Sequence, residues 1–308
     1  MKNIYLIFIS FFTCQNIPMY FKIIDQKKLE EISGASGIVK FNDYYYVVGD
    51  DTPYIFKLNS EFKVISEHMI SNIPVDLDSG RIPKKDKHDL ESLEMVSENE
   101  MISFGSGSKS PERDQFIRIM IDGEVSLKKY KLTAFYNALK GLDILRGSEL
   151  NIEAVAYING SLYLFNRRKN IIFCFDYKDF LDFIEDSSPL PEIKSYEFEL
   201  PDINGIEAGF SGATGWGKSK MLITFSVEDT DNAYDDGEIL GSFIGVISFD
   251  ENKINDLSSW VKIENGNKPL KVESITVSKE NTEKDIDVIM VTDSDCEKSS
   301  ILKGNLKW

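Results

Sequence analysis

Short apolar runs separated by turn-forming residues recur along most of the chain. Tyr44–Val48, Leu162–Phe165 and Val288–Thr292 are typical, and each is four or five residues long. Runs of this length that are rich in β-branched and aromatic residues favour buried β-strands. Asn42-Asp43 and Asn159-Gly160 lie between successive runs, where such pairs favour a tight hairpin. The pattern predicts an all-β protein.

One short phrase opens a predicted strand five times: a serine or glutamate, then a small residue, then an apolar one. The instances are Ser36-Gly37-Ile38, Glu91-Ser92-Leu93, Glu153-Ala154-Val155, Ser211-Gly212-Ala213 and Glu273-Ser274-Ile275. Their first residues are 55, 62, 58 and 62 positions apart. A near-constant period of this length with β-type content indicates a propeller in which each repeat is one four-stranded blade. The sequence therefore predicts a five-bladed β-propeller.

The two ends of the chain are expected to close the ring. The fifth repeat has three predicted strands, ending with Ile301–Leu306, and the early run Tyr20–Asp25 belongs to no repeat. Pairing of these two runs would make residues 20–308 one domain with only short protected edges. Apolar residues at helical spacing predict two short helices, at Thr133–Leu139 and Tyr177–Ile184.

The repeated phrase would bring three carboxylates and two hydroxyls around one axis, because the first strand of every blade lies innermost. Like charges at close range raise one another's pKa and oppose folding. A hard divalent cation removes the difficulty, and Ca²⁺ accepts many oxygen ligands in loose geometry. The predicted calcium ligands are Ser36, Glu91, Glu153, Glu273 and, in blade four, either Ser211 or Glu207.

The blade-four ligand has two readings. The local sequence favours Glu207, because Gly205-Ile206-Glu207-Ala208 resembles Asn151-Ile152-Glu153-Ala154. The distance to the next strand favours Ser211, because it matches the hairpin length of the other blades.

The formal net charge is −16, from 35 basic and 51 acidic residues. A surface this acidic would repel phosphate backbones, so we expect no nucleic-acid partner. Residues 1–14 read as an export signal, with Lys2 before the apolar run Ile4–Phe12, although that run could instead form an edge strand. Cys14 directly follows and would be the site of a lipid anchor. We expect an exported monomer in the periplasm or cell envelope. A lipid on Cys14 would attach it to the membrane.

The ordered set Ser36, Glu91, Glu153, Ser211 and Glu273 resembles the calcium-activated nucleotidases, the soluble apyrase family. Members carry Ser, Glu, Glu, Ser and Glu on the innermost strands of five blades around one axial Ca²⁺. Four further segments are similar to that family: Val48-Gly49-Asp50-Asp51, Gly105-Ser106-Gly107-Ser108-Lys109, Phe165-Asn166-Arg167-Arg168 and Ser226-Val227-Glu228-Asp229. The aromatic residue that follows the blade-two ligand in apyrases is replaced here by Ser92-Leu93. Asp89-Leu90-Glu91 also resembles phytase-like propellers.

The resemblance implies calcium-assisted hydrolysis of a phosphoanhydride or phosphoester. Arg167 and Arg168 would neutralise the phosphoryl group, and Lys109 would add a point charge. A general base would come from Asp50, Asp51 or Glu228. By composition alone, Arg167-Arg168 belongs to a solvent-exposed loop between two strands.

A second hypothesis comes from a different class of function. Propellers host many unrelated functions, so the chain could be a non-catalytic surface-binding protein that uses calcium as a structural pin.

Overall fold

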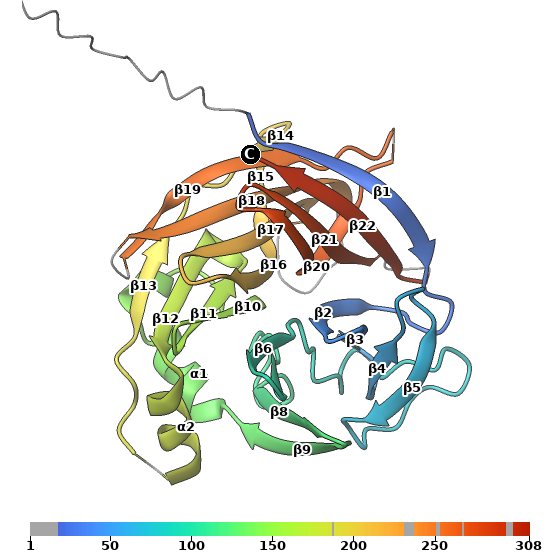
Figure 1. Cartoon of the computed structure of the whole chain (residues 1–308). Helices are drawn as coiled ribbons and strands as arrows, with labels where there is room; N and C mark the ends of the chain where they lie inside the picture. Colours follow the sequence, from blue (N-terminus) through green and yellow to red (C-terminus); the bar gives the residue numbers. More distant parts are fainter. Residues whose placement is uncertain (1–17, 187, 231–236, 251–252, 267, 294–297) are drawn as a thin grey trace, which may run out of the picture.

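The computed structural model describes residues 18–308 apart from residues 187, 231–236, 251–252, 267 and 294–297. Five four-stranded antiparallel sheets surround a central channel (Figure 1), which confirms the predicted five-bladed β-propeller. The predicted export signal at residues 1–14, with Cys14, lies outside the described residues. Within the described chain, no helix is long and apolar enough to cross a membrane.

Each blade uses consecutive strands, counted from the channel outward. Blade one contains β2 (Ala35–Phe41), β3 (Tyr44–Gly49), β4 (Tyr54–Leu58) and β5 (Val64–Met69). Blade two contains β6 (Glu94–Ser97), β7 (Glu100–Phe104), β8 (Gln115–Asp122) and β9 (Glu124–Lys131). Blade three contains β10 (Ile152–Ile158), β11 (Ser161–Asn166), β12 (Ile171–Asp176) and β13 (Lys194–Glu197). Blade four contains β16 (Gly209–Trp216), β17 (Lys220–Asp229), β18 (Glu238–Asp250) and β19 (Lys253–Lys262).

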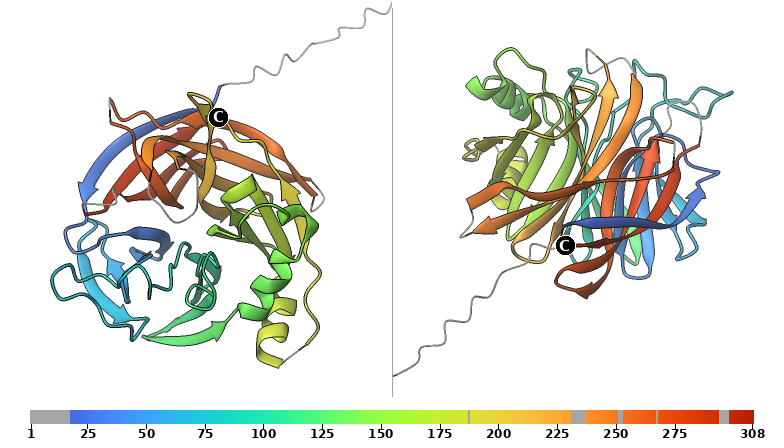
Figure 2. Two further views of the ribbon diagram at one scale, coloured as in Figure 1. Left: turned by 180° about the vertical axis from the view of Figure 1, so that it is seen from behind. Right: turned by 90° about the horizontal axis from the view of Figure 1, so that it is seen from above.

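Blade five joins the two ends of the chain. Its sheet order is β20 (Lys271–Thr282), β21 (Asp285–Asp293), β22 (Ser300–Lys307) and then β1 (Tyr20–Lys28). β1 runs antiparallel to β22, with Phe21 opposite Leu306, so the predicted closure is confirmed. Figure 2 shows the same closure from behind and edge-on, with β1 along the outer rim.

The innermost strands contact one another around the axis, in the order β2, β6, β10, β16 and β20 and back to β2. The last contact is hydrogen-bonded, because Ile38 N donates to Ser274 Oγ at 3.1 Å. Glycine makes two of these approaches possible. A Cβ on Gly37 would lie 2.9 Å from Leu93 N, and one on Gly212 would lie 2.8 Å from Ser274 Cα. The small residue of the repeated phrase therefore marks the places where neighbouring inner strands meet.

The first residue of the phrase occupies a β-bulge in four blades. The pairing register between the first and second strands shifts at Ser36, Glu153, Ser211 and Glu273. A bulge leaves one residue outside the ladder and re-aims its side chain. The same local distortion therefore recurs at the same end of the channel in blades one, three, four and five.

Blade two departs from the predicted pattern. Its first strand was expected over Glu91–Val96 but begins at Glu94. The Ser92 hydroxyl accepts a hydrogen bond from Phe104 N at 3.1 Å, in place of a backbone partner. Leu90 forms an isolated bridge with Gly105, and Glu91 follows it directly.

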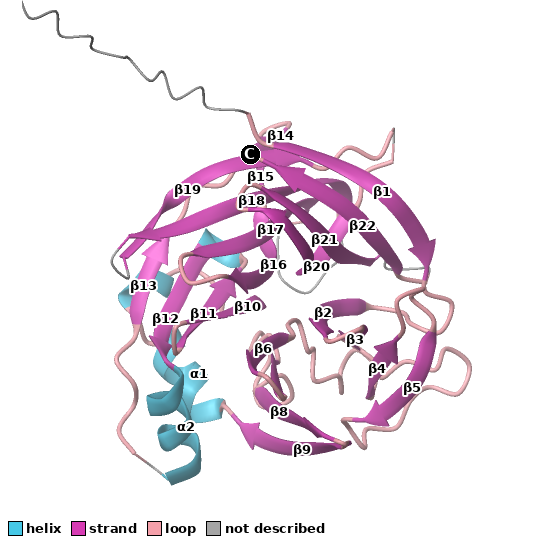
Figure 3. Cartoon of the chain, in the orientation of Figure 1, coloured by secondary structure: helices cyan, strands magenta, loops and turns pink. Residues whose placement is uncertain are grey.

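Two helices, α1 (Thr133–Lys140) and α2 (Tyr177–Asp186), confirm the predicted helical insertions (Figure 3). Their apolar faces meet between blades two and three: the ring centroids of Phe135 and Phe180 are 5.0 Å apart, and Phe180 lies 5.1 Å from Phe116. The short helices η1 (Asp143–Leu145) and η2 (Arg168–Asn170) and the small hairpin of β14 (Asp202–Ile203) and β15 (Ile206–Glu207) complete the fold.

One buried carboxyl group crosses the channel. Glu94 of blade two accepts a hydrogen bond through Oε1 from Gly215 N of blade four, at 3.4 Å. Within the described residues, its Oε2 atom is buried without a hydrogen-bond partner. Burial raises the pKa of Glu94 from 4.5 to about 8, so the folded protein holds this group in its neutral form near pH 7.

Glu94 should make stability fall with rising pH. Between the unfolded pKa of 4.5 and the folded pKa of about 8, the folded state keeps a proton that the unfolded state has lost. Glu94→Gln should therefore raise the free energy of unfolding at pH 8 by about 2–4 kcal/mol and change it little at pH 4. Urea unfolding at both pH values tests this, with the exposed Glu98→Gln as control. A Glu94→Gln protein that is less stable than wild type at pH 8 contradicts it.

Candidate functional site

One end of the channel collects charged side chains from all five blades. They are the six acidic residues Asp50, Asp89, Glu91, Glu153, Glu228 and Glu273 and the four basic residues Lys87, Arg113, Arg167 and Lys271. We call this set the mouth cluster. Six carboxyl groups thus share a largely buried region with four basic side chains.

The part of the mouth cluster on blades three to five consists of ion pairs. Arg167 lies 3.5 Å from Glu153 and 2.8 Å from Glu228, and its side chain is only 13% exposed. Lys271 lies 3.7 Å from Glu228 and 3.2 Å from Glu273. Gly209 makes room for the arginine, since a Cβ there would lie 2.5 Å from Arg167 Cγ.

Burial sets the proton affinities in this part of the cluster. It raises the pKa of Glu273 to about 8, opposed by Lys271 and Arg167 and reinforced by Glu153. Burial also raises the pKa of Glu153, although Arg167 and Lys271 lower it. The pKa of Arg167 is raised despite its burial, because Glu153 and Glu228 favour the charged guanidinium.

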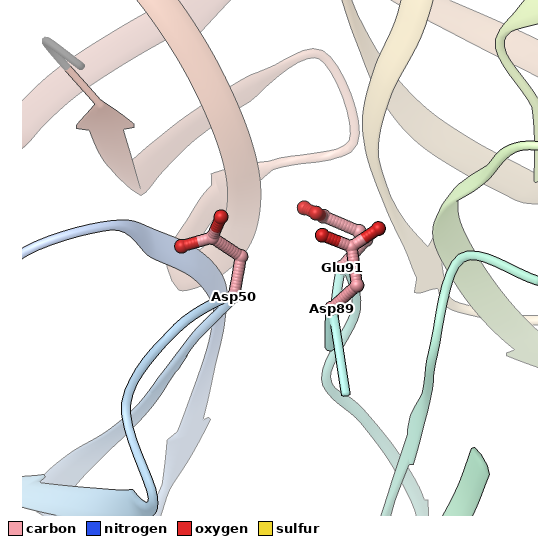
Figure 4. A group of neighbouring side chains, drawn as sticks. All are labelled: Asp50, Asp89 and Glu91. Atoms are coloured by element: carbon pink, nitrogen blue, oxygen red, sulfur yellow. The ribbon is translucent and has the colours of Figure 1, made fainter. Parts of the chain in front are cut away.

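The part on blades one and two is different. Asp50, Asp89 and Glu91 present carboxylate oxygens that all lie within 4.8 Å of one another. In Figure 4, Asp50 on blade one stands opposite Asp89 and Glu91, which come from the segment before β6. This is the one group of three or more such metal-ligating side chains that the described part of the chain brings this close. We call it the acidic triad.

Two basic residues neutralise part of the acidic triad. Lys87 pairs with Asp50 and lies 2.6 Å from Asp89, and Arg113 also lies 2.6 Å from Asp89. The pKa of Asp89 is lowered because these two bases outweigh its burial. Glu91 makes no side-chain ion pair among the described residues. Burial, Asp89 and Glu153 raise the pKa of Glu91 well above its usual value.

The acidic triad fits a hard divalent cation. Carboxylate oxygens are the ligands that Ca²⁺ prefers, and the triad oxygens lie close enough to share one ion. One such ion would also favour the ionised form of Glu91, whose pKa is raised when no cation is bound.

A pocket of about 430 Å³ adjoins the triad: Asp50 belongs to both, and Lys87, which pairs with the triad, also lines the pocket. Its other lining residues are Asp51, Asp76, Ser79, Arg81, Ile82, Pro83, Lys84 and Asp293. Most of them come from the long connection between β5 and β6, which is fastened to blade one where Ile82 N donates to Asp51 O at 2.7 Å. Burial and Asp50 raise the pKa of Asp51 to about 6, although Arg81 pairs with it and lowers it.

Ser36, Glu91, Glu153, Ser211 and Glu273, five of the predicted calcium ligands, lie at or just before the start of the inner strands, but their side chains have separate partners. The Ser36 hydroxyl donates to Leu90 O, and Ser211 Oγ lies 3.2 Å from Ser226 Oγ. Glu91 belongs to the acidic triad, whereas Glu153 and Glu273 contact Arg167 and Lys271. Calcium binding by this set stays a prediction.

The structure separates the two blade-four alternatives. Ser211 is buried on the innermost strand β16. Glu207 is exposed on β15, where its Oε1 accepts a hydrogen bond from Leu200 N at 3.1 Å. The sequence around Glu207 therefore belongs to a hairpin outside the four-stranded sheet of blade four.

The predicted catalytic residues are only partly brought together. Asp50, Arg167 and Glu228 belong to the mouth cluster, and Asp51 lines the pocket. Lys109 instead donates to Lys85 O at 2.9 Å and is 41% exposed. Arg168 makes no side-chain ion pair within the described residues and lines a second, smaller pocket beside Glu207. The expectation of an exposed Arg167 is wrong, because its guanidinium is enclosed by two carboxylates.

Sequence reasoning missed four basic residues: Arg81, Lys87, Arg113 and Lys271. Lys271 was detectable in principle, since it lies two positions before Glu273 at the start of an inner strand. The other three lie in loops whose composition resembles that of ordinary solvated loops. Only the three-dimensional course of those loops shows that their basic side chains reach the mouth cluster and the pocket.

Residues 31–306 of the chain match a family of unknown function, DUF6929. The chain belongs to this family. None of the curated proteins matches the sequence significantly.

Solved structures similar to this DUF6929 protein share its fold. Glutaminyl cyclase from Myxococcus xanthus aligns over 93% of this chain and 96% of its own, with a TM-score of 0.54 and 8% identity. The major allergen Mala s 1 of Malassezia sympodialis aligns over 92% and 96%, with a TM-score of 0.51 and 10% identity. At these identities the likeness shows the fold alone.

The two neighbouring arginines of the DUF6929 protein should differ sharply in their effect on stability. Arg167→Ala leaves Glu153 and Glu228 buried without their partner and should cost about 3–5 kcal/mol of unfolding free energy. Arg168→Ala removes no ion pair and should stay within about 0.5 kcal/mol of wild type. Chemical denaturation at pH 7 measures both. Equal effects of the two substitutions would contradict the ion-pair network described above.

Proposed function

We propose that this DUF6929 protein is an exported, calcium-dependent phosphohydrolase whose active site lies at the channel mouth between blades one and two. The observation that carries the proposal is the juxtaposition of the acidic triad with a pocket that contains Arg81, Lys84 and Lys87. Carboxylates for a hard cation beside basic groups for an anion are the parts that metal-assisted phosphoryl transfer needs. The resemblance of the ordered ring residues to the apyrase family supports the same reaction.

Asp50, Asp89 and Glu91 would hold the cation. When bound, Ca²⁺ would supply Lewis-acid stabilisation of phosphoryl oxygens. Arg81 and Lys84 would bind and orient the phosphoryl group from the other wall of the pocket, where guanidinium and ammonium groups suit phosphate.

Asp51 would accept the proton of the attacking water. A general base works best when its pKa lies near the operating pH, and the pKa of Asp51 is about 6. Arg81 holds the carboxylate in place through its ion pair. A cation bound at the neighbouring Asp50 would lower this pKa, so activity should rise with pH at or below about 6 as Asp51 loses its proton.

Calcium binding can be tested apart from activity. Glu91→Gln removes the triad carboxylate that makes no ion pair, so it should weaken Ca²⁺ binding at least tenfold. Lys87→Met removes an ammonium that competes for Asp50 and Asp89. That protein should melt lower without Ca²⁺ and gain more from its addition than wild type. Calorimetry and thermal melts measure both effects. The metal proposal is contradicted if Glu91→Gln leaves the Ca²⁺ affinity unchanged and if Ca²⁺ does not change the melting temperature of the wild-type protein.

The catalytic proposal is tested by phosphate release with Ca²⁺ or chelator across nucleotides, sugar phosphates, pyrophosphate and phytate. Asp51→Asn keeps the size of the side chain and an acceptor for Arg81 but removes the base. It should lower kcat roughly 10²-fold or more and abolish the rise of activity near pH 6. Asp86→Asn, an exposed residue of the same loop that does not line the pocket, is the matched control.

A second function has an observation in its favour. Five of the six mouth-cluster carboxylates already contact a basic side chain, which is also what a purely structural core of charges would look like. Tight Ca²⁺ binding without phosphate release from any compound would establish this non-catalytic binding propeller instead.

A further inference from the structure

The chemistry of the pocket narrows the class of substrate. Building on the phosphohydrolase function proposed above, we propose that the pocket takes a monosaccharide monophosphate: one phosphoryl group on a small, hydroxyl-rich carrier. A nucleotide or a polyphosphorylated compound fits the side chains that line the pocket less well. Three properties of the lining lead to this conclusion.

The first property is the absence of a stacking surface. No aromatic side chain lines the pocket among the described residues, and Ile82 and Pro83 are its only apolar members. Proteins that bind bases without reading their edges place them on aromatic rings, and each such contact contributes about 1–3 kcal/mol. A nucleobase would find no such surface among the described lining residues.

The second property is charge. Four carboxylates, Asp50, Asp51, Asp76 and Asp293, face three basic residues, Arg81, Lys84 and Lys87. The described lining residues therefore carry a formal net charge of −1 when no cation is bound. A triphosphate or phytate would bring many negative charges into this surrounding, whereas a monoester brings about −1.5 to −2. The balance favours a ligand with a single phosphoryl group.

The third property is the supply of hydrogen-bond acceptors. Asp76 Oδ1 accepts hydrogen bonds from Asp78 N, Ser79 N and Ser79 Oγ, at 3.1, 2.9 and 2.9 Å, which fixes the carboxylate at the pocket wall. Its Oδ2 atom accepts none among the described residues. Sugar hydroxyls are donors that carboxylates of this kind bind well. A volume of about 430 Å³ is within the range of small-molecule sites.

The test compares substrates and one conservative variant. With Ca²⁺ present, kcat/KM for glucose 6-phosphate should exceed the values for ATP, pyrophosphate and phytate at least tenfold. Asp76→Asn keeps Oδ1 for the turn but replaces Oδ2 by an NH₂ donor. This variant should raise KM for glucose 6-phosphate about 5- to 10-fold and leave KM for p-nitrophenyl phosphate, which has no hydroxyls, within twofold. Asp78→Asn, exposed and outside the pocket, should change neither.

The outcomes separate this inference from the proposed function. Preferred hydrolysis of ATP or phytate, or equal KM changes for both substrates in Asp76→Asn, overturns the substrate class and leaves the hydrolase intact. Failure to release phosphate from any substrate overturns the hydrolase. In that case calorimetry with glucose 6-phosphate and ATP in the presence of Ca²⁺ decides the ligand class. Tighter binding of ATP overturns the proposed sugar-phosphate class. Tighter binding of glucose 6-phosphate supports the class, provided that Asp76→Asn weakens this binding.

Discussion

The close approach of five inner strands around one axis is the constraint on which the rest of this structure depends. Gly37 and Gly212 lie where any side chain would collide with the neighbouring inner strand. Four of the five strands relieve the crowding with a bulge at the same place. Since a bulge re-aims the residue that it frees, the packing requirement also places Glu153 and Glu273 at the channel mouth. Packing and chemistry are therefore specified by the same short phrase.

That placement creates an electrostatic problem, which the two sides of the mouth solve differently. On blades three to five, Arg167 and Lys271 contact every carboxylate, and the arrangement is complete within the chain. On blades one and two, Lys87 pairs with Asp50 and Asp89, and Arg113 pairs with Asp89, whereas Glu91 makes no side-chain ion pair among the described residues. Burial, Asp89 and Glu153 raise the pKa of Glu91 well above its usual value, although Lys87 lowers it. The carboxyl groups beside blade two are therefore the less completely paired side of the mouth within the described residues.

The sequence predicted the fold well because the fold repeats. A period near sixty residues, tight turns, a spare N-terminal strand and a last repeat one strand short were enough for five blades and their closure, as the pairing of Phe21 with Leu306 shows. The site was predictable where it belongs to the repeat, as at Glu91, Glu153 and Glu273, or where a segment resembles the apyrase family, as at Asp50 and Glu228. Lys87 and Arg81 arrive on a long connection whose course depends on tertiary contacts such as Ile82 N to Asp51 O. No local pattern encodes that course.

The long connection also explains why the two ends of the channel differ in character. Deeper in the channel, Glu94 accepts a hydrogen bond from Gly215 N, and burial keeps its carboxyl group neutral near pH 7. At the mouth, the connection adds Lys87 and Arg81, which pair with Asp50 and Asp51 directly after β3. The ion pairs of the mouth cluster therefore gather at the mouth. A metal ion that only stabilised the fold would not require a charged pocket next to it. The difference in charge between the mouth and the deeper channel therefore favours a ligand-binding role for the mouth.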